Sequence, residues 1–219
     1  MCLLISINSG FRENNSNTSS KCIGLIDILF RICLISSKSS VLSTVNLNSE
    51  IFVSFSTIVR ITADCPLIDP QIVDKVIEQF FSGNYDFATN TLTRTFPIGT
   101  DVEVFSFSAL KRTWESAQLP SEREHVTPYL RNERNFKIIN VQNDKNISSL
   151  RLTVDRIEDF ELIKQILKNI SVNPIHLGDV LELFSRKPEL IEINKHIDNN
   201  EGFSRSLKED QEFIKKQKK

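Results

Sequence analysis

The chain has 219 residues, of which 40% are hydrophobic and 25% are charged, and its formal net charge is −1 at pH 7. This length leaves room for one α/β domain with a core, and the composition is ordinary for a globular protein. The near-zero charge gives no electrostatic basis for nucleic-acid binding.

Four cysteines without a CxxC pair argue against a zinc ribbon or a disulfide framework. The apolar run Cys22–Ile35 is too short to span a bilayer and contains Asp27 and Arg31. Met1–Ile7 lacks the basic region and the cleavage site of a signal peptide. We therefore expect a cytoplasmic protein in a reducing compartment, without a membrane partner.

Residues 1–58 are rich in serine and mix apolar runs with polar stretches such as 14–21. Their hydrophobic periodicity is weak, and capping signals are few. Because these local signals disagree with one another, we expect an atypical, poorly specified segment.

From residue 59 onward, predicted strands alternate with predicted helices. Apolar alternation predicts strands at 59–62, 86–90, 100–107, 137–141 and 150–154. Capping residues predict helix starts at Asp69-Pro70, Ser106, Ser121 and Asp155. This order indicates an α/β fold with βαβ units and a mixed, mostly parallel sheet over 59–204. Residues 205–219 read as a frayed helix or a solvated charged tail.

Two of these starts have the form of a capping box. Ser121 with Glu124 predicts a helix that runs toward Arg131, and Asp155 with Glu158 predicts another helix. Both assignments bear on function, because charged residues of interest follow each start.

Two short acidic motifs carry the clearest chemistry. Val59–Pro70 reads VRITADCPLIDP and Leu152–Phe160 reads LTVDRIEDF, and each is a strand that ends at an Asp. Asp64 and Asp155, if the fold brings them together, make a site for a divalent ion that suits phosphoryl or nucleotidyl transfer. Simpler roles compete, since Asp155 suits a helix N-cap and Asp64 suits a turn before Pro66.

Asp101 and Glu103 are the next candidates. They alternate with Val102 and Val104, so both acidic side chains should leave the strand on one side. On the cleft side they would contact a sugar or the water shell of an ion. The alternative is a half-exposed strand with its acidic residues in solvent.

A basic cluster follows in Arg123, His125 and Arg131. Arginine suits bidentate recognition of a sugar carboxylate or a phosphate, and His125 could move a proton or donate a hydrogen bond. The two arginines are near one face of the predicted helix. The alternative is a charged helix surface together with Glu122 and Glu124.

Other side chains receive ordinary roles. Cys65 has no basic partner in sequence and is expected to be a small buried residue. Trp114 is expected in the core or at an interface, and His176 and His196 at the surface or its boundary.

Four segments together resemble one family. They read VRITADCPLIDP, GTDVEVFSF, EREHVTPYLR and LRLTVDRIEDFELI, at residues 59–70, 99–107, 122–131 and 150–163. They are similar to the cytidylyltransferase-like spore coat polysaccharide biosynthesis proteins, which are related to acylneuraminate cytidylyltransferases. The C-terminal stretch Pro188–Gly202 is similar to the same proteins, so the resemblance covers about residues 59–210.

The resemblance implies a nucleotide-diphospho-sugar transferase fold, which is Rossmann-like. It also implies Mg²⁺-dependent transfer of CMP from CTP to an acidic sugar, with Asp64 and Asp155 as the catalytic, metal-side carboxylates. Asp101, Glu103, Arg123, His125 and Arg131 would then bind substrate. A homodimer is implied too, with contacts through Glu122–Arg131 and the C-terminal helices.

The family's opening strand and its glycine- and arginine-rich phosphate loop have no counterpart that we find here. The chain is then a truncated or frameshifted copy, a divergent enzyme with another phosphate site, or a non-catalytic remnant, and we favour the first. Two other functions stay open. One is a sugar- or nucleotide-binding or dimerisation module, and the other is a glycosyltransferase that uses Asp101-Val102-Glu103 as its metal motif.

Overall fold

A computed structural model describes residues 2–7, 57–132, 134–198 and 201–217. Its strands are β1 Cys2–Ile7, β2 Thr57–Thr62, β3 Phe87–Thr89, β4 Glu103–Ser106 and β5 Ile138–Asn140. Its helices are α2 Pro70–Phe81, α3 Phe107–Ser116, α4 Pro120–His125, α5 Ile157–Asn169, α6 Leu177–Arg186 and α7 Glu201–Gln217, with the 3-10 helices η2 Tyr129–Arg131 and η3 Pro188–Ile193. Within residues 1–58 it describes β1 and the start of β2; the rest of that predicted segment lies outside the described residues.

The strands form one mixed sheet in the order β1-β2-β4-β3-β5. The α/β class and the mixed sheet are confirmed, but the prediction of mostly parallel pairing is wrong for the described strands. The β1–β2, β2–β4 and β3–β4 pairs are antiparallel, and β3–β5 is parallel. The physical reason is that β4 inserts between β2 and β3 in the opposite direction, and apolar alternation carries no information about strand direction.

Helices cover both faces of the sheet because neighbouring strand residues point to opposite sides. One face carries Val59, Ala88 and Val104, which pack against the apolar stripe of α2. The other face carries Ile58, Phe87 and Phe105, which pack against Ala109 of α3 and Leu130 of η2. Each large buried apolar side chain contributes about 1.5–3 kcal/mol to folding. Two helix layers therefore hold the sheet rigid beneath any site built on it.

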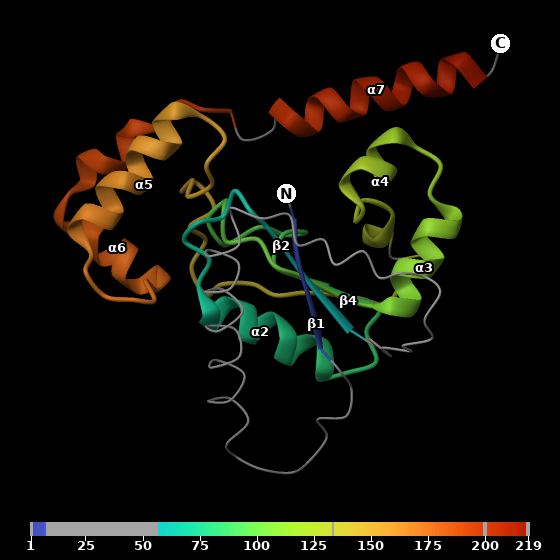
Figure 1. Ribbon diagram of the computed structural model, residues 1–219, viewed down its shortest axis with the longest axis horizontal. Helices are drawn as coiled ribbons and strands as arrows, with labels where there is room; N and C mark the ends of the chain where they lie inside the picture. Colours follow the sequence, from blue (N-terminus) through green and yellow to red (C-terminus); the bar gives the residue numbers. More distant parts are fainter. Residues whose placement is uncertain (1, 8–56, 133, 199–200, 218–219) are drawn as a thin grey trace, which may run out of the picture.

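A second group of helices lies beside the sheet. Figure 1 shows α5 and α6 at one side and α3 and α4 at the other, with α7 reaching over α4. The α5–α6 pair buries Leu162, Ile166 and Leu183 together with Leu152 and Leu67. The two acidic motifs thus each contribute one leucine to this shared core.

The predicted N-cap at Asp69 is confirmed and has a second role. Its side chain accepts a hydrogen bond from Gln71 N at the start of α2. It also accepts from Leu177 N at the start of α6, at 2.8 Å, and its other oxygen lies 3.0 Å from His176 Nδ1. One buried carboxylate therefore ties α2 to α6.

Residues 150–154 do not form the strand that their apolar pattern predicts. They are held by an isolated parallel bridge between Ile98 and Arg151. Gly99, at φ +93°, brings the preceding loop so close that an added Cβ would lie 2.3 Å from Thr153 N. The side chains of residues 150–154 pack like those of a strand. Their backbone, however, lies against the loop at Gly99 instead of pairing with a neighbouring strand.

The predicted helix from Ser121 toward Arg131 is interrupted. Its N-cap is Leu119, two residues before the predicted Ser121, and Glu122 accepts from the Leu119 backbone N–H at 3.0 Å. Leucine has no side-chain acceptor, so the predicted capping box does not form. Val126 then adopts φ 69°, in a region that β-branched residues rarely occupy. This turn ends α4, and Arg131 lies on the separate element η2.

The C-terminal charged segment belongs to α7, which starts before the predicted boundary at residue 204. Asp210 accepts hydrogen bonds from Ser121 N and Oγ at 3.0 and 2.6 Å. Ser206 Oγ lies 2.9 Å from His125 Nε2. Polar contacts therefore attach α7 to α4.

Two glycine variants test the close approach at Gly99. Gly99→Ala should destabilise the chain by more than about 2 kcal/mol, because the methyl group meets backbone atoms and the positive φ is strained. Gly178→Ala is the control, since it lies on α6 with open space around its Cβ. That control should be neutral or stabilise by up to about 1 kcal/mol. Urea unfolding measures both, and equal stabilities would contradict the packing described.

Candidate functional site

A small polar pocket lies where β2 and β3 end and β4 begins. It is lined by two basic, two acidic and two hydroxyl side chains: Arg60, Thr62, Thr91, Asp101, Glu103 and Arg131. Because β2, β3 and β5 run in one direction, this is the carboxyl edge of those strands, where α/β sheets bind ligands. Asp101 and Glu103 share one side of their segment, as predicted, while Val102 and Val104 are buried opposite.

Glu103 is the buried centre of this pocket, with 3% of its surface exposed. It is the cross-strand partner of Arg60, whose Nη1 donates to Oε2 at 2.5 Å. Arg131 Nη2 lies 3.2 Å from Oε1 and 3.2 Å from Thr91 Oγ1. Two guanidinium groups therefore share one carboxylate, which leaves this trio with a net positive charge suited to an anionic group.

Asp101 belongs to a second ion pair at the pocket's edge. Arg94 donates to both of its oxygens, at 2.5 and 2.8 Å. This bidentate pair keeps the pKa of Arg94 above its ordinary value although burial acts in the opposite direction. Asp101 is thus oriented by a neighbouring guanidinium.

Cys65 lies between the pocket and Asp64. Burial raises the pKa of its thiol to about 12, and the charges of Asp64 and Asp101 act in the same direction. Its Sγ lies 3.7 Å from Asp64 Oδ1 and 3.3 Å from Thr62 Oγ1. The prediction that Cys65 is a small buried residue is confirmed. Cys65 is a neighbour of both Asp64 and Asp101.

The two acidic motifs meet through their backbones. Val154 N donates to Asp64 O at 2.8 Å, and Thr153 Oγ1 donates to the same oxygen at 3.1 Å. Asp155 is the next residue along the chain, so the fold brings the two motifs together as the sequence predicts. Asp64 is half-buried, whereas 52% of the Asp155 side chain is exposed.

Asp155 is anchored by a buried network that the sequence did not indicate. Arg151 Nη2 donates to Asp155 Oδ2 at 2.8 Å. The same guanidinium donates to both oxygens of Asp159, at 2.9 Å each, and Asn194 Nδ2 donates to Asp159 at 2.8 Å. Burial opposes ionisation of Asp159, but these bonds outweigh it and lower its pKa below the ordinary value.

This network also corrects the predicted capping box of α5. The N-cap is Arg156, and Asp159 rather than Glu158 accepts from its backbone N–H, at 3.0 Å. Asp155 lies just before the helix. Arg156 is therefore the N-cap of α5. Asp155 does not take the N-cap role that was the alternative to a metal role.

Asp64 and Asp155 are the carboxylates at this edge that could hold a divalent ion. Among the described residues, no group of three or more His, Cys, Asp and Glu side chains is gathered closely enough to hold a metal ion. Mg²⁺ keeps most of its waters and uses one or two carboxylates together with substrate phosphates. Asp64 and Asp155 supply that number of carboxylates on adjoining segments.

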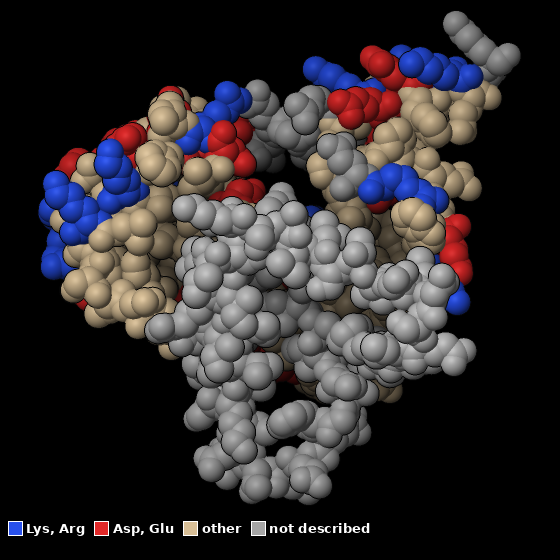
Figure 2. Space-filling view, viewed as in Figure 1, with Lys and Arg blue, Asp and Glu red and all other residues tan. Residues whose placement is uncertain are grey.

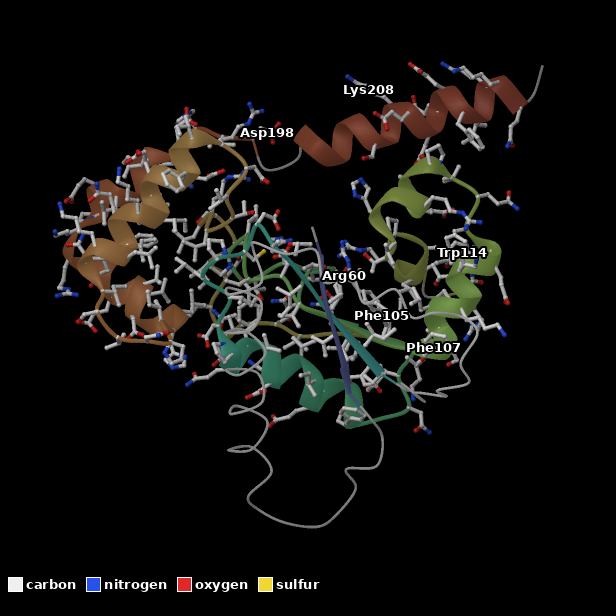
Figure 3. The ribbon with its side chains drawn as sticks, in the orientation of Figure 1. Arg60, Phe105, Phe107, Trp114, Asp198 and Lys208 are labelled. Atoms are coloured by element: carbon white, nitrogen blue, oxygen red, sulfur yellow. The ribbon has the colours of Figure 1, made fainter. Side chains whose placement is uncertain are left out.

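Arg123 and His125 do not join the pocket. The guanidinium of Arg123 lies 4.5 Å from the Trp114 ring, and His125 contacts Ser206 of α7. The turn at Val126 separates both from Arg131. Figure 3 shows Arg60 at the sheet and Trp114 on α3, away from it. Trp114 is 69% exposed, so the part of its prediction that placed it in the core is wrong.

Three charged residues of the site were missed in the sequence. Arg60, Arg94 and Arg151 each pair with a carboxylate that the fold brings near. One signal was present, since Arg60 is a lone charge between Val59 and Ile61 on an apolar strand. A charge at such a position requires a partner on the same face.

Charge on the visible surface is mixed in sign. Figure 2 shows Lys and Arg interspersed with Asp and Glu over α5 and along α7. None of the helices that the structure describes is long and apolar enough to cross a membrane. Among the described residues, the pocket is the feature that points to a ligand.

Glu103→Gln tests the shared carboxylate. Removing its charge leaves two guanidinium groups without their buried counter-ion, so the free energy of unfolding should fall by about 3 kcal/mol. Glu115→Gln is the matched control, because its pair with Lys111 is exposed and should change stability by less than about 0.5 kcal/mol. Urea unfolding at pH 7 measures both. A loss no larger for Glu103 than for the control would contradict the pairing.

The raised pKa of the Cys65 thiol predicts how its alkylation responds to pH. A thiol with a pKa of about 12 is ionised to about one part in ten thousand at pH 8, so the native chain should resist iodoacetamide at this residue. Raising the pH from 7 to 9 should leave it unmodified, whereas unfolding in urea should expose it. Peptide mass spectrometry follows the modification. Alkylation of the folded chain at the rate of free cysteine would overturn the assignment.

Comparison with known proteins places these features in a family. A cytidylyltransferase family model matches residues 29–184, and so includes part of the segment before residue 59. An uncharacterized protein of Methanocaldococcus jannaschii, MJ1063, is 31% identical over 153 residues, which is 68% of this chain and 62% of that protein. The spore coat polysaccharide biosynthesis protein SpsF of Bacillus subtilis is 28% identical over 139 residues, 61% of this chain and 57% of its own length.

A solved structure is similar as well. A cytidylyltransferase from Leptospira borgpetersenii serovar Hardjo-bovis has a TM-score of 0.62 and 29% identity, covering 86% of this chain and 70% of that chain. This chain spans about three fifths of the length of the two curated relatives. The mixed sheet, the order of the motifs and the family match over most of the chain agree: the chain belongs to the cytidylyltransferase family.

Proposed function

We propose that this chain transfers CMP from CTP to an acidic sugar, giving a CMP-sugar and pyrophosphate for polysaccharide synthesis. The observation that carries the proposal is the 2.8 Å bond from Val154 N to Asp64 O, which brings Asp64 and Asp155 to one edge of the sheet. The polar pocket with Arg60 and Arg131 lies at the same edge. Membership of the cytidylyltransferase family supports the choice of CTP.

In this proposal Asp64 and Asp155 hold a magnesium ion. When bound, the ion would offset charge on the phosphate oxygens and orient the triphosphate. Two contacts support this role, since Val154 N holds the backbone of Asp64 and Arg151 holds the side chain of Asp155. Their contribution would be positioning and electrostatics, without a covalent intermediate.

The pocket would hold the acceptor. Arg131, whose side chain is 40% exposed, would meet the sugar carboxylate, while Glu103 and Thr91 keep its guanidinium in place. Asp101 would accept hydrogen bonds from sugar hydroxyls. The acceptor hydroxyl then attacks the α-phosphorus of CTP, and the bond to the β-phosphate breaks to release pyrophosphate. The name of SpsF, a spore coat polysaccharide biosynthesis protein, supports a sugar acceptor.

Calorimetric titration with CTP, with and without magnesium, is the first test of this function. We expect binding that strengthens with Mg²⁺, because a triphosphate and two carboxylates repel one another unless a cation lies between them. If the folded chain does not bind CTP, the proposal is contradicted. That result would favour a non-catalytic module or an inactive copy.

Substitution of the two carboxylates tests the metal role directly. Asp64→Asn and Asp155→Asn should each abolish Mg²⁺-dependent turnover of a sugar-acid panel, while circular dichroism shows an intact fold. Glu161→Gln is the control, since this carboxylate lies on the exposed side of α5 and pairs with Lys164. Turnover that is unchanged in both Asp variants would overturn the assignment.

A further inference from the structure

One buried charged network lies directly behind the site and is not explained by folding alone. The side chain of Arg151 is 7% exposed and that of Asp159 is fully buried, yet the guanidinium also reaches Asp155, which is half-exposed. Asp159 already supplies a complete bidentate partner, with two bonds of 2.9 Å. The third bond, of 2.8 Å to Asp155, therefore goes beyond what pairing of the buried arginine requires.

The network makes Asp155 rigid in a way that an ordinary surface pair would not. Pairs between two exposed flexible side chains contribute little, because both lose conformational freedom. Here Arg151 is already fixed by Asp159, which in turn accepts from Asn194 and from the backbone N–H of Arg156. Only Asp155 is ordered by forming the bond.

The geometry of the contact leaves part of Asp155 for a ligand. Arg151 Nη2 engages Oδ2, and Oδ1 makes no hydrogen bond to any part of the chain that the structure describes. The side chains of Arg151, Asp155 and Asp159 together carry a net charge of −1. The edge thus stays attractive to a cation, while the guanidinium offsets repulsion between the two carboxylates.

We propose that Arg151 is a positioning residue that holds Asp155 in place for a divalent cation. The inference rests on the proposed function, in which Asp155 is a metal-side carboxylate. Partners that orient a ligating carboxylate affect metal affinity by about 10- to 100-fold. Arg151 would act through Asp155, without contacting the substrate.

Arg151→Lys separates geometry from charge. Lysine keeps the positive charge but lacks the planar fork that binds Asp155 and Asp159 at once. We expect the affinity for Mn²⁺, used as a probe in the presence of CTP and without acceptor, to fall about tenfold. Electron paramagnetic resonance of free Mn²⁺ measures this without relying on turnover.

Asn194→Ala is the matched control. Asn194 donates to Asp159 and to Arg151 O from a buried position, but it does not contact Asp155. Both variants should lower the melting temperature, and Mn²⁺ binding should weaken less in Asn194→Ala than in Arg151→Lys, because Asn194→Ala leaves the bond from Arg151 to Asp155 in place. If Arg151→Lys binds Mn²⁺ within twofold of the unsubstituted chain, then Arg151 only stabilises the fold and the proposal is wrong.

Asp155→Asn distinguishes failure of this inference from failure of the proposed function. If Asp155→Asn binds Mn²⁺ normally, Asp155 is no ligand and both proposals fall. If Asp155→Asn loses Mn²⁺ affinity and Arg151→Lys does not, only the positioning role is wrong.

A measurement on the unsubstituted chain covers the case in which Arg151→Lys does not fold. The guanidinium ¹⁵N resonances of Arg151 should shift when Mg²⁺ and CTP are added together, because its partner Asp155 gains a cation. Unchanged resonances at saturating Mg²⁺ and CTP would overturn the proposal.

Discussion

The site depends on one backbone contact, the hydrogen bond from Val154 N to Asp64 O. It joins the end of β2 to a segment that has no ordinary strand partner, and so it sets the relative positions of Asp64 and Asp155. The close approach of Gly99 to Thr153 supports the same segment. Because backbone atoms make these contacts, the fold sets where the two aspartates lie, and Arg151 then orients the carboxylate of Asp155.

The pocket shows how the chain keeps arginines at a candidate ligand site without a large cost in stability. Arg60 and Arg131 both pair with Glu103, and Arg94 pairs with Asp101. Each guanidinium therefore has a partner before any ligand binds. A buried charge that lacks a partner would cost several kcal/mol. An incoming anion would therefore meet groups whose direction is already set, and its binding would involve little reorganisation.

The sequence predicts those features that depend on neighbouring residues. Alternation placed Asp101 and Glu103 on one side of their segment, and capping chemistry placed the starts of α2 and α3 but missed those of α4 and α5 by two residues and one residue. The predictions failed for features that are determined by contacts between distant residues. Helical spacing grouped Arg123 with Arg131, but the turn at Val126 separates them, and strand direction within the sheet left no local signal.

The charged residues that the sequence analysis missed also depend on contacts between distant parts of the chain. These contacts join motifs that lie far apart in the sequence. Arg60 and Glu103 become partners through the β2–β4 register, and Arg94 meets Asp101 across a loop. The first and fourth resembling segments meet at Asp64 and Val154, and the first and second at Arg60 and Glu103. The resemblance is thus concentrated in stretches that contact one another at one edge of the sheet. Each of these motifs supplies one partner of a contact, so no single motif contains the whole candidate site.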